Sequence, residues 1–491
     1  MTADGDSVVW AGWPQAPAPL AAIRRAHPAP VVDDAGREVP FGPLRFAFEL
    51  VRSAYLRVLD ALLAGVAATL SPRRTPPTPT GPREHHHVVL VLPVLPDLSH
   101  TFVYREVLAI RQQRPDWRII VLDRNARAPV HAEAAALLPD ATFVPRDGIT
   151  RRAARVLGWL LRRRGRELFG LYRSQPGGSV RDLLGKNPLR DARHPGNAFA
   201  LADLLRRAPL DHVHVYSSTY AANVAMGAAH LLGVPFSISS YVDFEFPYAH
   251  KMLAEKVARA RFFRVVSQFD RQVLRAQPEL PSLEDTRVPV VDFGLDVTQW
   301  TETRAPTGRG VLVSAARLVE KKGFHLVPSV LAALRARGLA CRWRLLGEGP
   351  DRARIEREIA AHDVGDLVDL LGACDNASVR RELLAADLAL LPCVTTSDGE
   401  RDGIPIFLVE AMALCVPVVT TPVAGIPEIV RDDDTGFLAP SGDAAALVER
   451  VATALADADR AAAIGRRGRE AVLHKFDVRT TAAELVQCIE A

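Results

Sequence analysis

Two cationic side chains, Arg317 and Lys322, stand between an apolar run and a glycine. The run, residues 310–315, has the composition of a buried strand, and an amphipathic helix is expected after Gly323. Arginine offers a planar fork of N–H donors and lysine a mobile point charge, which together suit a diphosphate better than a single carboxylate. The start of the helix adds its positive end. A solvated basic turn explains this stretch equally well when it is taken alone.

Two carboxylates, Asp402 and Glu410, are separated by seven residues around a second helix start. We expect Asp402 in a loop that contains glycine and proline, and Glu410 at the opening of the apolar run of the helix. The backbone N–H groups of Gly403 and Ile404 would then face an anion. The flanking carboxylates can accept hydrogen bonds from sugar hydroxyls. These features predict a ligand with both phosphate and hydroxyl groups.

The elements that must position these residues form two similar sets. Short, continuous apolar runs alternate with helical stretches, which is the pattern of a parallel sheet covered by helices. The first set has a helix near 101–113 and expected strands at 88–93, 118–123, 142–144, 212–217, 235–240 and 262–267. The second has expected strands at 310–315, 343–349, 368–373, 388–393 and 416–421. Ligands of such sheets bind beyond the carboxyl ends of the strands, so two facing sheets would form a cleft.

The 491 residues exceed the size at which one hydrophobic core keeps growing, so two domains are expected. We predict an α/β protein with doubly wound domains at 88–296 and 297–476 and a last helix at 477–491. Residues 1–87 form an extension. It combines a tail rich in alanine and proline, an amphipathic helix and a proline-rich linker, and we expect little fixed structure in the tail and no regular structure in the linker.

Charge and cysteine content narrow the class of protein. The 61 basic and 57 acidic residues leave a net charge of +4, which gives no sign of a nucleic-acid partner. The five cysteines show no CxxC spacing, as in a reduced cytoplasmic protein. Neither a secretory signal nor a run of about 18 apolar residues is apparent. We expect a cytoplasmic protein that is peripheral at most at the inner face of the membrane.

Two segments combine arginines with apolar residues. Residues 44–70 have helical periodicity, and residues 151–173 alternate arginines with side chains such as Val156 and Trp159. Such segments can rest on anionic lipid with their apolar side dipped and their arginines near the phosphates. The plainer interpretation, a helix packed on its own domain, stays open for both.

Two groups of residues could in principle bind a metal ion, but we expect that neither does. His85, His86 and His87 are adjacent and lack the spacing of ligands in structured sites. The run RDDDTG at 431–436 is expected to be an acidic surface turn. We therefore predict no metal ion and no cofactor.

The stretches around Arg317 and Asp402 resemble the Arg-x4-Lys-Gly and acidic-x7-Glu motifs of glycosyltransferase family 4, which has the GT-B fold. RDGIP followed by EAMA, with LSHTFVYREVLAI at 98–110, is similar to the branch that contains colanic-acid and other exopolysaccharide glycosyltransferases. The similarity runs from about residue 88 to the C-terminus. It implies two facing Rossmann-like domains, with the acceptor bound by the first and the donor by the second. It also implies that the last helix crosses back to the first domain.

The resemblance implies a role for each residue of the donor motifs. Arg317 and Lys322 would hold the donor diphosphate and act as the chief catalytic groups, and Glu410 would bind the ribose hydroxyls. Asp402 would contact hydroxyls of the transferred sugar. The family usually has the longer glutamate at this position, which leaves the preferred sugar open.

Further residues are carried over in the same way. Gly347 and Gly349 match the glycine turn where the backbone approaches the nucleotide, although a tight turn alone also explains them. Gly372 falls at the strand end that binds the base. On the acceptor side, Tyr241 stands where the family commonly has a histidine, and Asp243 lies nearby. A tyrosine is a poor general base near neutral pH.

The implied activity is transfer of a sugar from a nucleoside diphosphate sugar with retention of anomeric configuration, in the synthesis of a cell-surface polysaccharide or a glycosylated metabolite. A UDP-sugar is favoured over a GDP-sugar as donor, and the acceptor is a glycan, a lipid-linked molecule or a small molecule. Two alternatives remain: a degenerate GT-B protein that binds a nucleotide or partner without turnover, and a nucleotide-sugar epimerase of the same fold.

Overall fold

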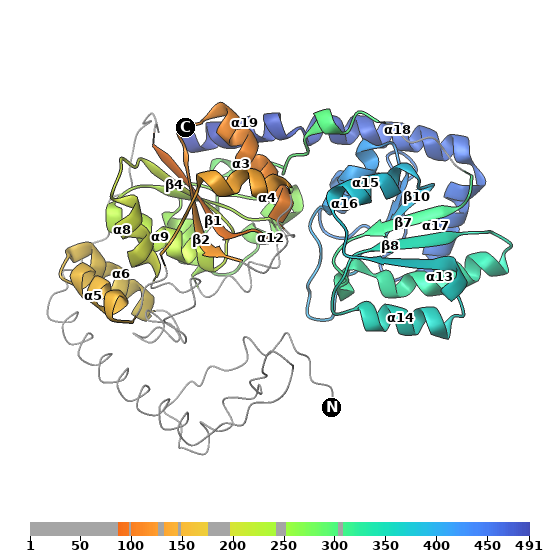
Figure 1. Cartoon of the computed structure of the whole chain (residues 1–491), viewed down its shortest axis with the longest axis horizontal. Helices are drawn as coiled ribbons and strands as arrows, with labels where there is room; N and C mark the ends of the chain where they lie inside the picture. The colour runs from red at the N-terminus through yellow and green to blue at the C-terminus, as the bar shows by residue number, and fades with distance from the viewer. Residues whose placement is uncertain are drawn as a thin grey trace, which may run out of the picture.

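The computed structural model describes residues 87–97, 100–125, 132–145, 149–174, 197–241, 252–302 and 308–491. These residues form two parallel six-stranded sheets, each covered by helices, which lie next to each other along the long axis of the molecule (Figure 1). The extension predicted at 1–87 lies outside the described residues except for His87. The predicted class of two doubly wound α/β domains is confirmed.

The N-terminal sheet has the strand order β3-β2-β1-β4-β5-β6. Its central strands are buried on both faces, which explains why their sequences are continuously apolar rather than alternating. The strands are β1 (Val88–Leu95), β2 (Arg118–Arg124), β3 (Ala141–Phe143), β4 (His212–Tyr216), β5 (Phe236–Ser239) and β6 (Phe263–Arg264). The helices are α3 (Thr101–Gln113), α4 (Ala132–Leu137), α5 (Ile149–Leu160), α6 (Arg163–Ser174), α8 (Asn197–Leu205), α9 (Tyr220–Leu232), α11 (Leu253–Arg259) and α12 (Gln268–Arg275).

The C-terminal sheet has the order β12-β11-β10-β7-β8-β9. Read from the β9 edge, this is the same order as in the N-terminal sheet. Its strands are β7 (Val311–Ala315), β8 (Arg342–Leu346), β9 (Val368–Gly372), β10 (Leu388–Leu391), β11 (Val418–Thr420) and β12 (Phe437–Leu438). Its helices are α13 (Val327–Ala336), α14 (Arg352–Ala361), α15 (Asn376–Leu384), α16 (Ile406–Ala413), α17 (Ala444–Ala456) and α18 (Ala458–Lys475). In each sheet the strand order reverses beside the first strand, and such switch points are where doubly wound folds bind ligands.

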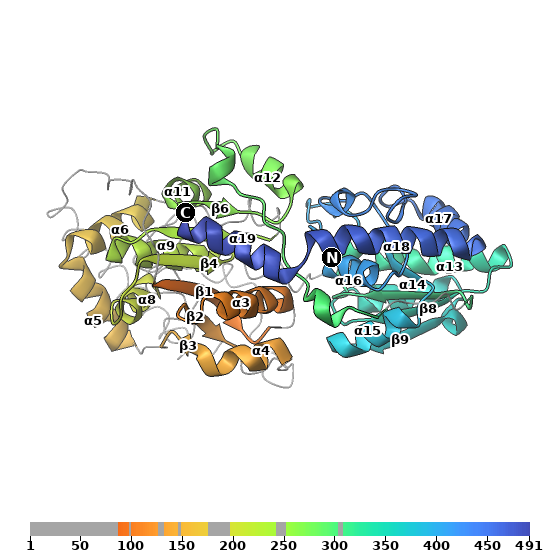
Figure 2. The same ribbon diagram turned by 90° about the horizontal axis from the view of Figure 1, so that it is seen from above.

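The last helix, α19 (Val478–Glu490), packs against α3 of the N-terminal domain. Leu485 and Ile489 are fully buried in the same apolar cluster as the first strand and α3. Arg114 donates to Glu490 at 2.6 Å and fixes the end of the helix. Figure 2 shows α18 lying over the C-terminal domain and α19 continuing over the N-terminal one. The end of the chain therefore joins the two domains.

A buried ion pair ties α3 to β6. The two terminal nitrogens of Arg264 donate to the two carboxylate oxygens of Glu106 at 2.9 and 2.7 Å, and both side chains are almost fully inaccessible. Arg264 also donates to the carbonyl oxygens of Val291 and Asp292 at 2.8 and 2.7 Å. The guanidinium is thus well satisfied only while its carboxylate partner is present.

Glu106→Ala is therefore expected to lower the free energy of unfolding by about 3–5 kcal/mol, because it leaves the Arg264 charge buried without its partner. Urea unfolding followed by circular dichroism measures the loss. The control is Arg342→Ala, which breaks an exposed ion pair with Asp369 and should leave the unfolding midpoint unchanged. A Glu106→Ala variant as stable as this control would contradict the argument.

Candidate functional site

The loop after β7 carries Arg317 and Lys322. Gly323 has φ 69°, and a Cβ there would lie 1.8 Å from the carbonyl oxygen of Pro392, so only glycine lets this loop lie against the chain that follows β10. Arg317 is exposed and makes no side-chain hydrogen bond or ion pair within the described part of the chain. It is nonetheless close enough to Lys322 to lower the pKa of that amine. The two predicted cations therefore share one edge of the C-terminal sheet.

Lys322 is directly paired with Asp402, and both side chains are only 13% exposed. Burial raises the pKa of the Asp402 carboxyl, but the lysine ammonium groups outweigh it, and the pKa ends below its usual range. Burial lowers the pKa of Lys322, but Asp402 outweighs it, and that pKa ends raised. Both groups are therefore ionised at neutral pH. An ammonium has three N–H donors, so Lys322 can bind a phosphate while it holds Asp402.

The neighbouring Lys321 was missed as a site residue. Its side chain is 6% exposed, and its ammonium lies 2.8 Å from Glu400 and 3.7 Å from Asp402. The signal was the adjacent pair of lysines before Gly323. Asp402 is thus held by two cations, which fixes it more firmly than Lys322 alone would.

Glu410 does not open the apolar run of its helix, as predicted. Helix α16 begins at Ile406, and Glu410 is its fifth residue and buried. The prediction was wrong because the apolar residues before Glu410 are already helical and pack into the core. Pro405, at the N-cap of α16, gives no side-chain cap, and Gly403 and Ile404 are buried just before it.

Arg105 of α3 contacts Glu410 from the other domain. Its Nη1 donates to Glu410 at 3.2 Å and its Nε to Glu133 of α4 at 3.0 Å. Sequence reasoning missed both residues, although Arg105 lies within the quoted stretch 98–110. Burial raises the pKa of the Glu410 carboxyl, and Arg105 opposes that rise.

The predicted glycine turn lies at the same sheet edge. Gly347 has φ 140°, and a Cβ there would lie 1.9 Å from the carbonyl oxygen of Ala316 in the loop that carries Arg317. Gly349 lies against the backbone of Leu318, and the N–H of Gly347 donates to the carbonyl oxygen of Gly372 at 2.7 Å. The close approach of Ala316 is by itself enough to require glycine at position 347, so a tight turn explains this residue without a bound nucleotide. The ends of β7, β8 and β9 are brought together here.

Tyr241 follows β5 in the N-terminal domain and is half-buried in an aromatic group. Its ring packs edge-on against Phe102 at 4.8 Å and parallel to Tyr216 at 6.4 Å between centroids. The Arg264 guanidinium lies 5.6 Å from its centroid. Phe102 and Tyr241 also pack against the C-terminal core, so they stand where the domains meet. Asp243 lies outside the described residues.

The acidic run 431–436 is paired with arginines. Asp432 pairs with Arg450, and Asp434 lies 2.8 Å from both Arg431 and Arg467. Across the described ranges, no group of three or more histidine, cysteine or acidic side chains could hold a metal ion. His85 and His86 lie outside those ranges.

Residues 151–173 form two helices, α5 and α6, rather than one. Most of their apolar side chains, such as Val156, Trp159 and Phe169, are buried in the N-terminal core, as the plainer interpretation holds. Leu157 and Leu161 are 53% and 72% exposed beside exposed arginines. Membrane contact at this surface stays a prediction, and residues 44–70 lie outside the described ones. Among the helices that the structure describes, none is long and apolar enough to cross a membrane.

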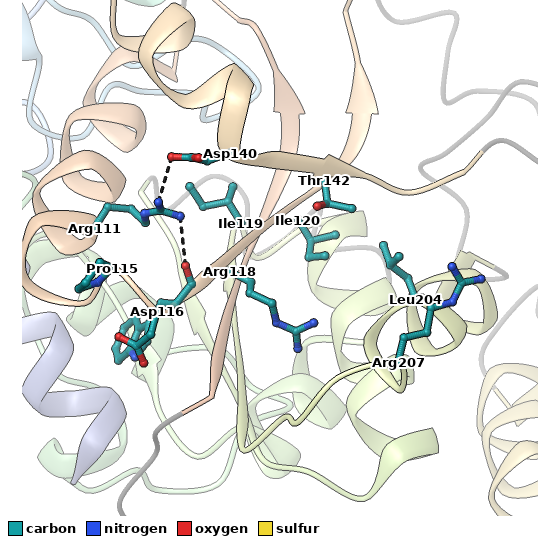
Figure 3. Close-up of a pocket in the computed structure, with 11 residues that line it drawn as sticks. Arg111, Pro115, Asp116, Arg118, Ile119, Ile120, Asp140, Thr142, Leu204 and Arg207 are labelled. Carbon is teal, nitrogen blue, oxygen red and sulfur yellow. Dashed lines mark hydrogen bonds and ion pairs between the residues drawn. The ribbon is translucent and has the colours of Figure 1, made fainter.

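A cavity of about 300 Å³ lies at the amino ends of β2 and β3 (Figure 3). Arg111 points to Asp140 across it, and Arg118 and Arg207 line its other side. Doubly wound sheets bind their ligands at the carboxyl ends of the strands, and this cavity lies at the opposite end. It therefore does not contribute to the site described above.

Residues 299–471 match the family model of glycosyl transferases group 1. The predicted resemblance is confirmed. The protein named as the colanic acid biosynthesis glycosyltransferase WcaL of Escherichia coli (strain K12) is 38% identical over 208 residues, 42% of this chain and 51% of that protein. The amylovoran biosynthesis glycosyltransferase AmsK of Erwinia amylovora is 40% identical over 136 residues, 28% and 33% of the two chains.

A GDP-mannose-dependent alpha-(1-6)-phosphatidylinositol monomannoside mannosyltransferase of Mycolicibacterium smegmatis is 32% identical over 182 residues, 37% of this chain and 48% of that protein. The chain thus spans about half the length of the curated relatives it matches. Among solved structures, HepE of Anabaena in complex with UDP and glucose has a TM-score of 0.61 at 15% identity, over 82% of this chain and 99% of that one. This likeness shows the fold, which is GT-B.

Proposed function

We propose that the protein is a glycosyltransferase that moves a sugar from a nucleoside diphosphate sugar to an acceptor in exopolysaccharide biosynthesis. The observation that carries the proposal is the ionised pair of Lys322 and Asp402 beside the exposed Arg317 at the carboxyl edge of the C-terminal sheet. The names of the relatives WcaL and AmsK support the polysaccharide context.

The proposed reaction breaks the bond between the anomeric carbon and the diphosphate oxygen. The diphosphate leaves with the bonding electrons, and Arg317 and Lys322 stabilise the negative charge that develops on it. The acceptor hydroxyl oxygen forms the new bond to the anomeric carbon, and its proton passes to an oxygen of the leaving phosphate. Asp402 keeps Lys322 protonated and accepts from a hydroxyl of the transferred sugar. In this scheme the protein acts mainly by positioning and electrostatics.

We also propose retention of anomeric configuration and a reaction without a metal ion, both of which the family resemblance implies. A UDP-sugar is the first donor to test, because HepE, which shares the fold, was solved with UDP. The GDP-mannose-dependent relative makes a GDP-sugar the second. The acceptor stays one of three kinds, a glycan, a lipid-linked molecule or a small molecule.

The test is calorimetric binding of UDP, GDP and their sugar conjugates, in the presence of EDTA, followed by a donor-hydrolysis assay. Micromolar binding and slow release of free sugar are expected, with the released anomer read by NMR before it mutarotates. Release of an epimeric sugar would indicate the epimerase, and binding without turnover the degenerate protein. Failure of every nucleotide to bind would overturn the proposed site.

A further inference from the structure

The carboxylate of Glu410 is held by a residue of the opposite domain. Arg105 and Glu410 are 11% and 8% exposed, and the nitrogen and oxygen that join them lie 3.2 Å apart. The contact uses only Oε1 of Glu410. Arg105 and Glu410 are 305 residues apart in sequence, so their meeting depends on how the two domains are placed.

We propose that Arg105 is a positioning residue of the nucleotide site, which holds Oε1 of Glu410 and leaves Oε2 to accept from a ribose hydroxyl. This inference rests on the proposed function, in which Glu410 binds the ribose. It adds a part of the donor site that comes from the N-terminal domain. The nucleotide would therefore bind fully only when both domains are in place.

Glu133 fixes Arg105 in this orientation. Its Oε1 accepts from the Nε of Arg105 at 3.0 Å and from the Nδ2 of Asn376, in α15 of the C-terminal domain, at 3.4 Å. The guanidinium thus lies between two carboxylates from different domains. Such a fork holds its partners in a defined direction, which a lysine ammonium does less well.

Charge makes the role of Arg105 measurable. Among the described residues, the charged groups that act on Glu410 are Arg105 from α3 and Glu133 from α4. Burial and Glu133 raise the pKa of Glu410, and Arg105 opposes them. Loss of Arg105 would raise this pKa further, so the carboxyl would take up a proton at a higher pH. A protonated carboxyl accepts hydrogen bonds less well, so ribose binding in such a variant would weaken as the pH falls.

The experiment compares calorimetric binding of UDP and 2′-deoxy-UDP, or the guanosine pair if GDP is the better ligand, between pH 5.5 and 8.5. The wild type should prefer the ribonucleotide by about tenfold, the value of one hydrogen bond to a charged group. Arg105→Gln should bring the ratio near one at pH 7 and recover it in part at higher pH. Arg105→Lys, which keeps the charge but not the planar fork, should retain part of the ratio. Arg111→Gln, on the same helix, is the control and should change nothing.

Each other outcome points elsewhere. If Glu410→Gln abolishes the ratio and Arg105→Gln does not, Arg105 has no positioning role and the donor site stands. If Arg105→Gln binds UDP more tightly, Arg105 competes with the ribose and the inference is overturned. If the wild type binds UDP and 2′-deoxy-UDP equally well, Glu410 does not bind the ribose 2′-hydroxyl and the inference is overturned. A wild type that binds no nucleotide would overturn the proposed function itself.

Discussion

Arg317→Ala is expected to lower kcat for sugar transfer by about 10²–10³-fold while leaving the unfolding midpoint unchanged. The loss follows from removing one preorganised donor from the charge that develops on the leaving diphosphate. Stability should not change, because the side chain is exposed and has no hydrogen-bond or ion-pair partner within the described ranges. A variant that loses activity without losing stability would mark Arg317 as a catalytic residue.

The measurement is initial-rate kinetics with the donor identified by calorimetry, together with urea unfolding. Arg342→Ala removes another exposed arginine of the same domain and should keep wild-type kcat. Arg342 lies at the amino end of β8, whereas the Arg317 loop follows the carboxyl end of β7. Arg317→Lys keeps the charge but loses the planar fork, so an intermediate rate is expected. Equal rates for Arg317→Ala and the control would mean that the loop is a solvated basic turn, the alternative that the sequence left open.

Most of the fold could be predicted because its signals are local. The helix predicted near 101–113 coincides with α3, whose buried side chains such as Val103, Val107 and Ile110 recur three and four residues apart. The strand predicted at 343–349 ends at Leu346, because the chain turns at Gly347, which has φ 140°. The strand β12 has only two residues, too few to form a pattern.

The candidate site was predictable where its residues lie in short sequence motifs. Arg317, Lys322 and Asp402 belong to short sequence motifs. The structure brings Lys322 and Asp402 together as an ion pair. Lys321 was missed because the motif points to Lys322 alone, whereas the structure brings both ammonium groups to Asp402. Arg105 was missed because its contact with Glu410, 305 residues away in sequence, arises only where the two domains pack together.

The second large effect is expected at the pair of Lys322 and Asp402. Lys322→Met should lower kcat by about 10³-fold, the upper end for one electrostatic donor, because it removes a phosphate contact and one of the two ammonium groups that hold Asp402. Asp402→Asn should lower kcat by about 10²-fold, since Lys322 keeps its charge but loses the partner that aims it. The double variant should be little worse than Lys322→Met, because groups that act as a unit have non-additive effects.

The pair also predicts how stability changes with pH. The pKa of Asp402 is below its usual range in the folded protein, so its ionisation contributes stability that is present above its unfolded pKa and lost as the pH falls through the folded one. In Lys322→Met that contribution should shrink, with Lys321 as the remaining partner of the carboxylate. Urea unfolding of the wild type, the two single variants and the double variant between pH 3 and 7 measures this. These measurements separate the effect of each variant on stability from its effect on kcat. If the effects of Lys322→Met and Asp402→Asn on kcat were additive in the double variant, the two side chains would act independently, and Asp402 would not orient the lysine.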